Sequence, residues 1–361
     1  MAHDKKEMIS FYLTTRCNLD CIYCYTNKNS NDHAHQTLDL DFAMAGIDDY
    51  YKTDFMRHVR FFGAGEPTIE FGLMQDILAY AKKKDINTTS ELQTNGCFNN
   101  DIARWIAENI DIVWISSDGL PEIQNHYRPL AGGGKSSEIL EKNIQFLVKN
   151  TKATVGIRTT ITNRNVCSQI DMIHYFAGLG IRNFWVDPIF PTIGSQNAFE
   201  KLDMEVFTKE FIKAVKYAYK NGLTYGSILT CNFDEAGEYA CRACLPVPHL
   251  TTDGYVSACD MALFGNDADH MNVFIYGKWK KEKRRIEYYP DKIKQLQARK
   301  LSNMPNCKNC TAGKYCRGYC LGEVVNETQN LFGCKHIICE PVRTILRELT
   351  EYEKKYKYSH P

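Results

Sequence analysis

Over its first 225 residues, the chain alternates short apolar segments with longer segments in which apolar residues recur at helical spacing. Short runs rich in β-branched and aromatic residues are typical of buried strands, and apolar positions three to four residues apart are typical of helices. The expected strands are residues 8–15, 58–65, 89–95, 112–118, 153–161 and 183–189. The expected helices are residues 40–52, 72–84, 100–109, 137–150, 166–179 and 203–221.

This alternation predicts an α/β fold with a parallel sheet and helices on its outside. Six strand–helix units favour a partial (β/α)6 TIM-like barrel, and an open doubly wound sheet is the alternative. After about residue 225 the alternation stops, cysteines appear and loops are expected to dominate, up to a C-terminal helix over 340–357. We therefore expect two domains, residues 1–225 and 226–361.

Charge and composition narrow the function. The 361 residues carry a formal net charge of +1, so no strong field points to nucleic acid or to an anionic membrane. No apolar signal region or membrane-spanning run is visible, and we expect a cytoplasmic protein. The fifteen cysteines are an odd number in a chain without a signal peptide, which favours metal or redox chemistry over disulfides.

Three cysteines, Cys17, Cys21 and Cys24, follow the first expected strand. They should lie at the C-terminal end of that strand, where barrel folds place their chemistry. Thiolates suit iron–sulfur clusters and zinc. Three of them leave one coordination position open, whereas a structural zinc ion needs a fourth ligand nearby. A zinc loop or a chance grouping is the competing interpretation.

The Cys-x3-Cys-x2-Cys spacing, with aromatic Tyr23 before the last cysteine, resembles the signature of the radical S-adenosylmethionine (SAM) superfamily. The resemblance implies a [4Fe–4S] cluster on the three thiolates, with the amino and carboxylate groups of SAM on the fourth iron. An electron from the reduced cluster then yields a 5′-deoxyadenosyl radical. The family's partial (β/α)6 barrel agrees with the six units counted above.

The segment "FFGAGEPT" (61–68) resembles the family's Gly-Gly-Glu-Pro segment at the end of the second strand. Gly63 and Gly65 would let backbone carbonyls approach the cofactor's amino group, and Glu66 would add an acceptor. Ala64 stands where the family has its second glycine.

Two further strand ends, "LQTNG" (92–96) and "ISSDG" (115–119), resemble cofactor-facing segments of the family. Ser116 is a candidate for binding the cofactor's carboxylate, and Arg158 could pair with that carboxylate through two hydrogen bonds. Ordinary polar bonding inside the barrel explains both residues equally well.

The remaining clustered cysteines resemble the SPASM domain, whose pattern is Cys, Gly-x4-Cys, Cys-x2-Cys-x5-Cys-x3-Cys and a final Cys. The family domain holds two auxiliary [4Fe–4S] clusters, which makes three clusters in all. The ligands carried over for the first auxiliary cluster are Cys241, Cys244, Cys259 and Cys320. Those for the second are Cys307, Cys310, Cys316 and Cys339. Cys339 is preferred to Cys334 as the last ligand because it is expected to precede the C-terminal helix directly. For both sets together, a pair of zinc knuckles is the alternative to iron–sulfur clusters.

Asp260 directly follows Cys259, as in a similar Cys-Asp step of the anaerobic sulfatase-maturing enzymes. The resemblance implies a proton acceptor during oxidation of Ser or Cys. Next to an anionic cluster its pKa is expected to be raised, which would suit a general base. An aspartate that only forms hydrogen bonds beside the cluster is the competing interpretation.

Together these features predict a radical SAM/SPASM oxidoreductase that abstracts hydrogen from a residue of a peptide or protein, in peptide natural-product maturation. Sulfatase maturation, from Ser or Cys to formylglycine, is the alternative. A non-catalytic iron–sulfur or zinc protein is a third, disfavoured because it needs no cofactor cradle. The expected partners are the peptide or protein substrate and a low-potential electron donor of flavodoxin or ferredoxin type. Because Cys17 lies so near the start, we expect a leader peptide to be recognised by a separate partner protein or by the rim of the barrel.

Overall fold

The computed structural model describes residues 7–24, 26, 35–189, 202–266 and 269–357. Its first half confirms the six expected strands, each pairing in parallel with the next along the chain. These strands are β1 (Ile9–Tyr12), β2 (His58–Phe62), β3 (Thr89–Thr94), β4 (Ile112–Ser116), β5 (Thr154–Ile161) and β6 (Asn183–Pro188).

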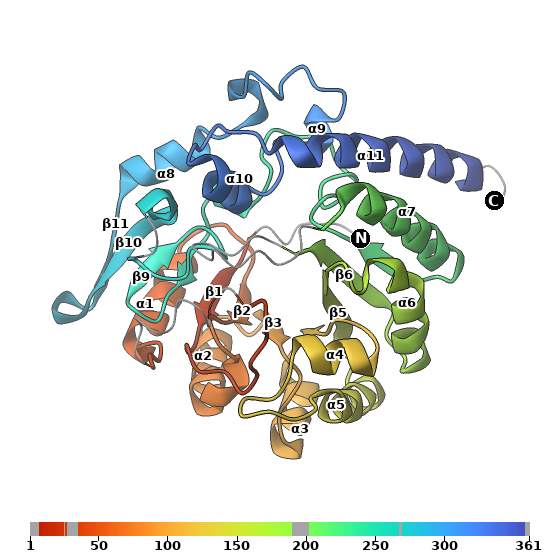
Figure 1. Cartoon of the computed structure of the whole chain (residues 1–361). Helices are drawn as coiled ribbons and strands as arrows, with labels where there is room; N and C mark the ends of the chain where they lie inside the picture. The colour runs from red at the N-terminus through yellow and green to blue at the C-terminus, as the bar shows by residue number, and fades with distance from the viewer. Residues whose placement is uncertain (1–6, 25, 27–34, 190–201, 267–268, 358–361) are drawn as a thin grey trace.

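The expected helices are also present, and they form a ring outside the strands (Figure 1). They are α1 (Leu40–Tyr50), α2 (Phe71–Lys84), α3 (Asn100–Asn109), α5 (Ser137–Asn150), α6 (Gln169–Gly178) and α7 (Met204–Lys220). A short additional helix, α4 (Pro121–Tyr127), follows β4. Capping agrees with the sequence, since the side chain of Asp39 accepts from the Phe42 N–H at the start of α1.

Strands β1 to β6 follow one another in sequence order and curve with the helices on their outer side, as predicted for a barrel and unlike a doubly wound sheet (Figure 1). The barrel is partial because β1 and β6 do not pair with each other. On the far side of β6, the strand order continues to β7 (Thr224–Gly226), which is parallel to β6. On the far side of β1, it continues to β8 (His249–Leu250), which is parallel to β1. One hydrogen-bonded sheet therefore joins the two halves of the chain.

Alternation along the barrel strands separates an apolar face from a polar one. Phe11 and Phe61 are fully buried in the large core that includes the helices, as are their equivalents on the other strands. Their neighbours Tyr12 and Arg60 belong to the opposite face, because successive side chains of a strand point to opposite sides. This second face carries the polar groups of the barrel interior.

Among the loops expected after residue 225, the described part of the chain contains four short strands and three short helices that the sequence pattern did not predict. Strands β8, β9 (Tyr255–Ser257), β10 (Ile275–Lys280) and β11 (Arg285–Tyr288) extend the sheet in antiparallel pairs beyond β8. The helices of this half are α8 (Pro290–Gln297), α9 (Gly313–Cys316), α10 (Leu321–Thr328) and α11 (His336–Lys357). Strands of two to six residues leave too short a pattern for the alternation to be recognised.

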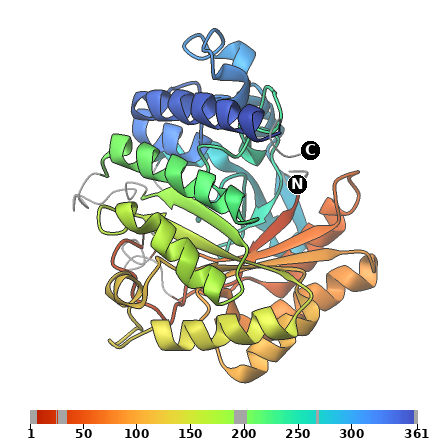
Figure 2. The same ribbon diagram turned by 90° about the vertical axis from the view of Figure 1, so that its right-hand side faces the viewer.

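The C-terminal helix α11 packs along α7, and the two helices lie side by side in both views (Figures 1 and 2). It begins at His336, one turn before the expected start at residue 340. Pro341, a residue more typical of a first turn, lies inside the helix. Cys339 is therefore in the first turns of α11 and does not precede it.

Among the residues described, none belongs to a helix that is both long and apolar enough to cross a membrane.

Candidate active site

The three clustered cysteines lie on the loop that leaves β1 at its C-terminal end, as predicted. The N–H of Cys24 donates to the Cys21 carbonyl at 3.0 Å, which closes a turn between them. Cys17 and Cys21 each lie within electrostatic range of Cys24, and all three side chains are partly exposed. The amide nitrogen of Asn95, just after β3, is 3.9 Å from the Cys17 sulfur. The loop thus presents three thiols at one end of the barrel.

The glycine segment after β2 holds this loop in place. The N–H of Gly65 donates to the Thr14 carbonyl at 2.9 Å, and the N–H of Glu66 donates to the Arg16 carbonyl at 2.8 Å. A Cβ on Gly65 would collide with the Arg16 carbonyl oxygen, and one on Gly63 with the Gly65 carbonyl oxygen. The backbone approach therefore requires glycine at both positions.

Glu66 is buried and joins the ends of β2 and β3. Its Oε1 accepts from the Thr68 N–H at 3.1 Å and from the hydroxyls of Thr68 and Thr94, each at 2.7 Å. Its Oε2 accepts from the Asn95 N–H at 2.7 Å. Burial raises the pKa of this carboxyl. Ala64, within the glycine segment, is also buried. A contact from Glu66 to a cofactor remains a proposal.

Arg158 and Ser116 lie opposite each other in the β4–β5 register. The Arg158 guanidinium donates to Gln93 Oε1 at 2.9 Å and to Asp187 Oδ2 at 3.2 Å. Trp185 Nε1 donates to the same Asp187 oxygen at 2.9 Å. The predicted cofactor arginine thus links the ends of β3 and β6 inside the barrel.

Tyr23 leads to a buried acid–base pair that sequence reasoning missed. Its hydroxyl donates to Asp118 Oδ2 at 2.5 Å, and Arg128 Nε donates to the same oxygen at 3.1 Å. The other Asp118 oxygen accepts from the Thr160 N–H at 3.2 Å. Burial is the main cause that raises the pKa of Tyr23 well above its usual value. The signal was present, because Asp118 belongs to the "ISSDG" segment after the fourth strand.

Asp260 is the centre of an ion-pair cluster. Its carboxylate pairs with the guanidinium groups of Arg60 and Arg242, lies 3.1 Å from His249 Nδ1, and accepts from the Tyr12 hydroxyl at 3.3 Å. Burial alone would raise its pKa, but the two arginines and His249 outweigh burial and hold the pKa well below its usual range. Among the protein groups alone, the direction is thus opposite to the raised pKa expected for Asp260 next to an anionic cluster.

Sequence reasoning did not single out Arg60, Arg242 or His249. A charged residue inside the apolar strand "HVRFF" was a usable signal for Arg60, because strand interiors rarely bury an unpaired charge. For the other two, no local pattern exists. Their contacts depend on how the second half packs against β1 and β2.

Four thiols of the second half come together beside this ion-pair cluster. Cys241 and Cys244 share a side-chain hydrogen bond, and both Cys259 and Cys320 lie within electrostatic range of Cys241. A Cβ on Gly322 would lie 2.8 Å from the Cys259 sulfur. The first predicted auxiliary set is thus assembled from three separate segments.

The second predicted set also comes together, with one additional thiol. Cys316 lies within electrostatic range of Cys310 and Cys339, and Cys307 within range of Cys316. The side chain of Cys334 shares a hydrogen bond with that of Cys307, and the Cys334 sulfur is 3.6 Å from the Cys339 sulfur. Both candidates for the final ligand therefore reach the same place.

These donor sets fit the groups implied by the sequence, because clustered thiolates are the ligands of iron–sulfur clusters. Within the described residues, one group has all of its donor atoms within 4.8 Å of one another, namely Cys334, His336 and Cys339. Such spacing also suits a single tetrahedral ion. The number of clusters remains a proposal.

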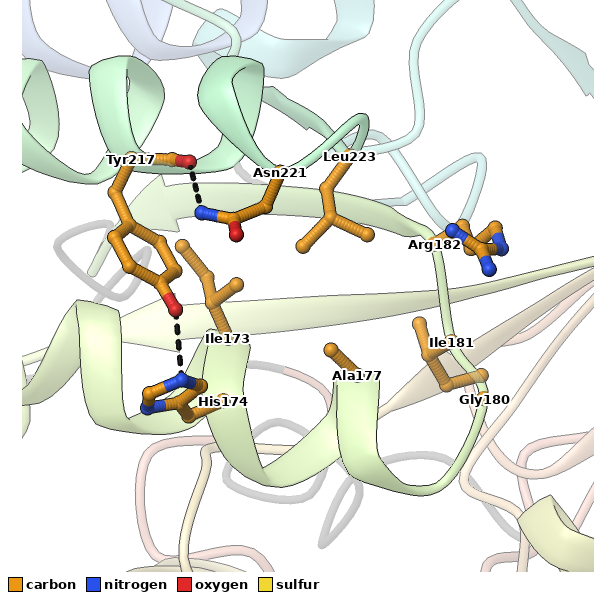
Figure 3. Close-up of a pocket in the computed structure, with 9 residues that line it drawn as sticks. All are labelled: Ile173, His174, Ala177, Gly180, Ile181, Arg182, Tyr217, Asn221 and Leu223. Atoms are coloured by element: carbon orange, nitrogen blue, oxygen red, sulfur yellow. Dashed lines mark hydrogen bonds between the residues drawn. The ribbon is translucent and has the colours of Figure 1, made fainter.

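A cleft of about 240 Å³ lies elsewhere, between α6 and α7 (Figure 3). Ile173, Ala177 and Leu223 give it an apolar lining, and the Tyr217 hydroxyl is 2.7 Å from His174 Nε2. Its other lining residues include Arg182, which precedes β6. The cleft is thus at the N-terminal end of that strand, whereas the cysteine loop is at the C-terminal end of β1.

Comparison with known proteins gives a match of residues 11–176 to the Radical SAM superfamily model. A Methanocaldococcus jannaschii protein, MJ0907, is 34% identical over 50% of this chain and 61% of its own. A Pyrococcus furiosus tungsten-containing aldehyde ferredoxin oxidoreductase cofactor-modifying protein is 27% identical over 62% and 65%. A Clostridium novyi cysteine-type anaerobic sulfatase-maturating enzyme is 29% identical over 45% and 45%. The chain thus spans less than two thirds of these relatives.

Two solved structures share the fold at low sequence identity. Native anSMEcpe with bound AdoMet and the Kp18Cys peptide has a TM-score of 0.76 and 16% identity, covering 98% of this chain and 99% of that one. Streptococcus suis SuiB bound to the precursor peptide SuiA has a TM-score of 0.65 and 15% identity, covering 92% and 75%. The segment that matches the Radical SAM superfamily model, residues 11–176, thus contains the cysteine loop after β1 and the glycine segment after β2.

Proposed function

We propose that this protein is a radical SAM enzyme that removes a hydrogen atom from an amino-acid residue of a peptide or protein, in peptide natural-product maturation. The observation that carries the proposal is the extent of the shared fold. It covers 98% of this chain for anSMEcpe and 92% for SuiB, both of which were solved with a peptide. The likeness extends beyond the radical SAM domain into the cysteine-rich half, which supports a related use of that half.

The barrel end supplies the parts that this reaction needs. Cys17, Cys21 and Cys24 would hold a four-iron cluster that, with SAM on its fourth iron, supplies the 5′-deoxyadenosyl radical. The segment 63–66 fixes their loop and presents backbone carbonyls to the amino group of SAM. Arg158 would bind the carboxylate of SAM together with Ser116, exchanging a bond that it now makes to Gln93 or Asp187.

The cysteine-rich half would hold two auxiliary clusters, on the two sets of four cysteines defined above. An external donor of flavodoxin or ferredoxin type would supply electrons to the enzyme. Asp260 stays a candidate catalytic residue, but its contacts support another role. A carboxylate bonded to two guanidinium groups holds those groups in place.

Iron content and SAM cleavage test the proposal together. Protein reconstituted without oxygen should carry about 12 irons per chain, and the triple Cys→Ala variant at 17, 21 and 24 about 8. Reduced wild type should release 5′-deoxyadenosine slowly from SAM, whereas Cys21→Ala should release none. Stoichiometric zinc without visible absorbance, or intact clusters with no deoxyadenosine, would refute the assignment.

The peptide class needs its own measurement. Short peptides encoded next to the gene should increase deoxyadenosine release and change in mass when incubated with enzyme and SAM. A response confined to a cofactor-sized compound, such as the cofactor of a tungsten-containing aldehyde ferredoxin oxidoreductase, would contradict a peptide substrate.

Formylglycine formation is the second candidate, favoured by the Clostridium novyi relative and by the Cys259–Asp260 step. It predicts that a sulfatase-derived peptide with Ser or Cys at the target position gains an aldehyde. Hydrazide labelling detected by mass spectrometry measures this product. If sulfatase peptides are labelled and the peptide encoded by the neighbouring gene is not modified, formylglycine formation becomes the preferred function.

A further inference from the structure

Arg299 is a fully buried cation whose partners are all neutral. Its guanidinium donates to the carbonyls of Leu331 at 2.7 Å, Arg317 at 3.2 Å and Gly318 at 3.1 Å, and it contacts the Met304 thioether. Its side chain has 0% exposure. In the parts of the chain that the structure describes, no carboxylate lies within ion-pair distance of it.

Such an arrangement needs a counter-charge. Carbonyl oxygens satisfy the N–H groups but do not neutralise the charge, and burying an uncompensated ion costs several kcal/mol even after relaxation. Buried arginines in proteins are therefore paired as a rule. The surroundings of Arg299 offer thiols as groups that could carry this negative charge.

The guanidinium sits at the junction of the two auxiliary cysteine sets. Arg317 and Gly318, whose carbonyls it binds, lie between Cys316 of the second set and Cys320 of the first. It also lies within electrostatic range of one thiol from each set, Cys244 and Cys307. Two bonds thus tie it to the short peptide that connects the sets.

Contacts on the other side of the guanidinium point the same way. Met304, which touches Arg299, packs in one small apolar cluster with Cys307 and Cys334. A Cβ on Gly318 would lie 2.6 Å from Nη2 of Arg299, so only glycine lets the backbone approach so closely. The packing leaves the cation little freedom to move away from the thiols.

We propose that Arg299 is a shared counter-cation for the two auxiliary clusters and sets their reduction potentials. The inference rests on the proposed function, because it requires clusters on both sets. A four-iron cluster with four thiolates is anionic and gains further negative charge on reduction. A cation held nearby at low dielectric stabilises the reduced form more than the oxidised form, which raises the potential of both clusters.

Two variants separate charge from structure. Arg299→Lys keeps the positive charge with fewer donors, and Arg299→Gln keeps polar contacts without the charge. Both are reconstituted anaerobically as full-length protein, their iron is counted, and each cluster is titrated with mediators while electron paramagnetic resonance is recorded. The cluster on Cys17, Cys21 and Cys24 serves as an internal control.

Arg299→Gln should lower the reduction potentials of both auxiliary clusters by at least about 59 mV. For a one-electron couple, this equals a tenfold lower ratio of reduced to oxidised cluster at a fixed solution potential. Arg299→Lys should move them much less, and the control cluster should not move in either variant. Loss of auxiliary iron in Arg299→Gln with retention in Arg299→Lys would also support the proposal, because charge would then be needed for assembly.

Unchanged potentials in an iron-replete Arg299→Gln variant would overturn the proposal. Equal loss of auxiliary iron in both variants would overturn it too, and make Arg299 a residue that only holds the backbone. If wild-type protein holds only about 4 irons, it has no auxiliary clusters, and both this inference and that part of the proposed function are refuted.

Discussion

Asp260 shows at the scale of one residue how strongly surroundings decide chemistry. Beside a cysteine that binds an anionic cluster, a carboxyl group is expected to keep its proton, because the negative charge of the cluster disfavours the ionised form. In this fold it instead lies between Arg60, on β2, and Arg242, in the second half. Two cations and one anion form a compact group that joins the halves of the chain.

Asp260→Asn should therefore destabilise the protein. It leaves the almost completely buried Arg60 and the largely buried Arg242 without their carboxylate, a change that typically costs about 3–5 kcal/mol. Urea unfolding under anaerobic conditions measures the effect. Asp41→Asn is the matched control, because the Asp41–Arg284 pair is exposed and should be worth about 1 kcal/mol or less.

The competing general-base role predicts a different result for the same variant. Product formation should then fall by about 10²–10⁴, while deoxyadenosine release, iron content and the unfolding midpoint stay at wild-type level. A variant with unchanged stability and uncoupled SAM cleavage would contradict the structural role.

The last ligand of the second set is also decided by single residues. The family pattern implies that Cys339 would hold the second auxiliary cluster. Cys339→Ala should then lose about 4 of about 12 irons, whereas Cys334→Ala should keep them. Iron and acid-labile sulfide assays on both variants measure this. The reverse result would make Cys334 the ligand, and full iron in both would show that the two thiols, 3.6 Å apart, replace each other.

At the scale of elements, the turn after β2 positions the cysteine loop after β1. The two segments share hydrogen bonds from Gly65 and Glu66 to the backbone of Thr14 and Arg16. Neither segment is regular structure, so their mutual bonds substitute for a helix or strand. The geometry of the first cysteine set thus depends on a close backbone contact.

Gly65→Ala should disturb that contact, because its Cβ would meet backbone of Arg16, which cannot rotate away as a side chain can. We expect loss of about 4 irons and of SAM cleavage, with the auxiliary iron retained. In the control Gly72→Ala, nothing lies within 4 Å of the new Cβ. This exposed helical position should keep its iron and gain up to about 1 kcal/mol of stability. Equal iron in the two variants would contradict the prediction.

At the scale of the whole molecule, the two halves share one sheet and one pair of packed helices. Strand β8 pairs with β1 through His249 and Leu250. Helix α11 contacts α7 through the Lys216–Glu348 pair at 3.3 Å. A boundary at residue 225 therefore separates the first cysteine set from the two auxiliary sets, whereas the hydrogen-bonded sheet continues across it.

A fragment of residues 1–225 should consequently fail to fold as a stable monomer. Removing β8 leaves β1 as an unprotected edge, which favours aggregation, and α7 loses its partner helix. Size-exclusion chromatography and circular dichroism measure the outcome. The control is the full chain cut at an engineered protease site after residue 225, which should stay assembled. A monomeric fragment holding about 4 irons would instead establish an independent domain.

The sequence by itself determined whatever depends on local spacing. Six strand–helix units, the three cysteines after the first strand and the glycine segment after the second are patterns within a few residues, and periodicity encodes them directly. Family resemblance extended this to the two auxiliary sets, whose members the fold brings together. The start of α11 was misplaced by one turn, because helix boundaries are less clearly encoded in the apolar spacing than the helix itself.

Tertiary structure alone decided the contacts between distant segments. Arg60 and Asp260 are 200 residues apart in sequence, and no spacing rule connects them. The same holds for Arg299 between two cysteine sets, and for the short strand β8 beside β1. The charge state of a buried group depends on which cations pack around it, and the packing of separate segments fixes that choice. The sequence therefore predicts the clustered cysteines and the glycine segment, while the fold determines the charged groups that surround them.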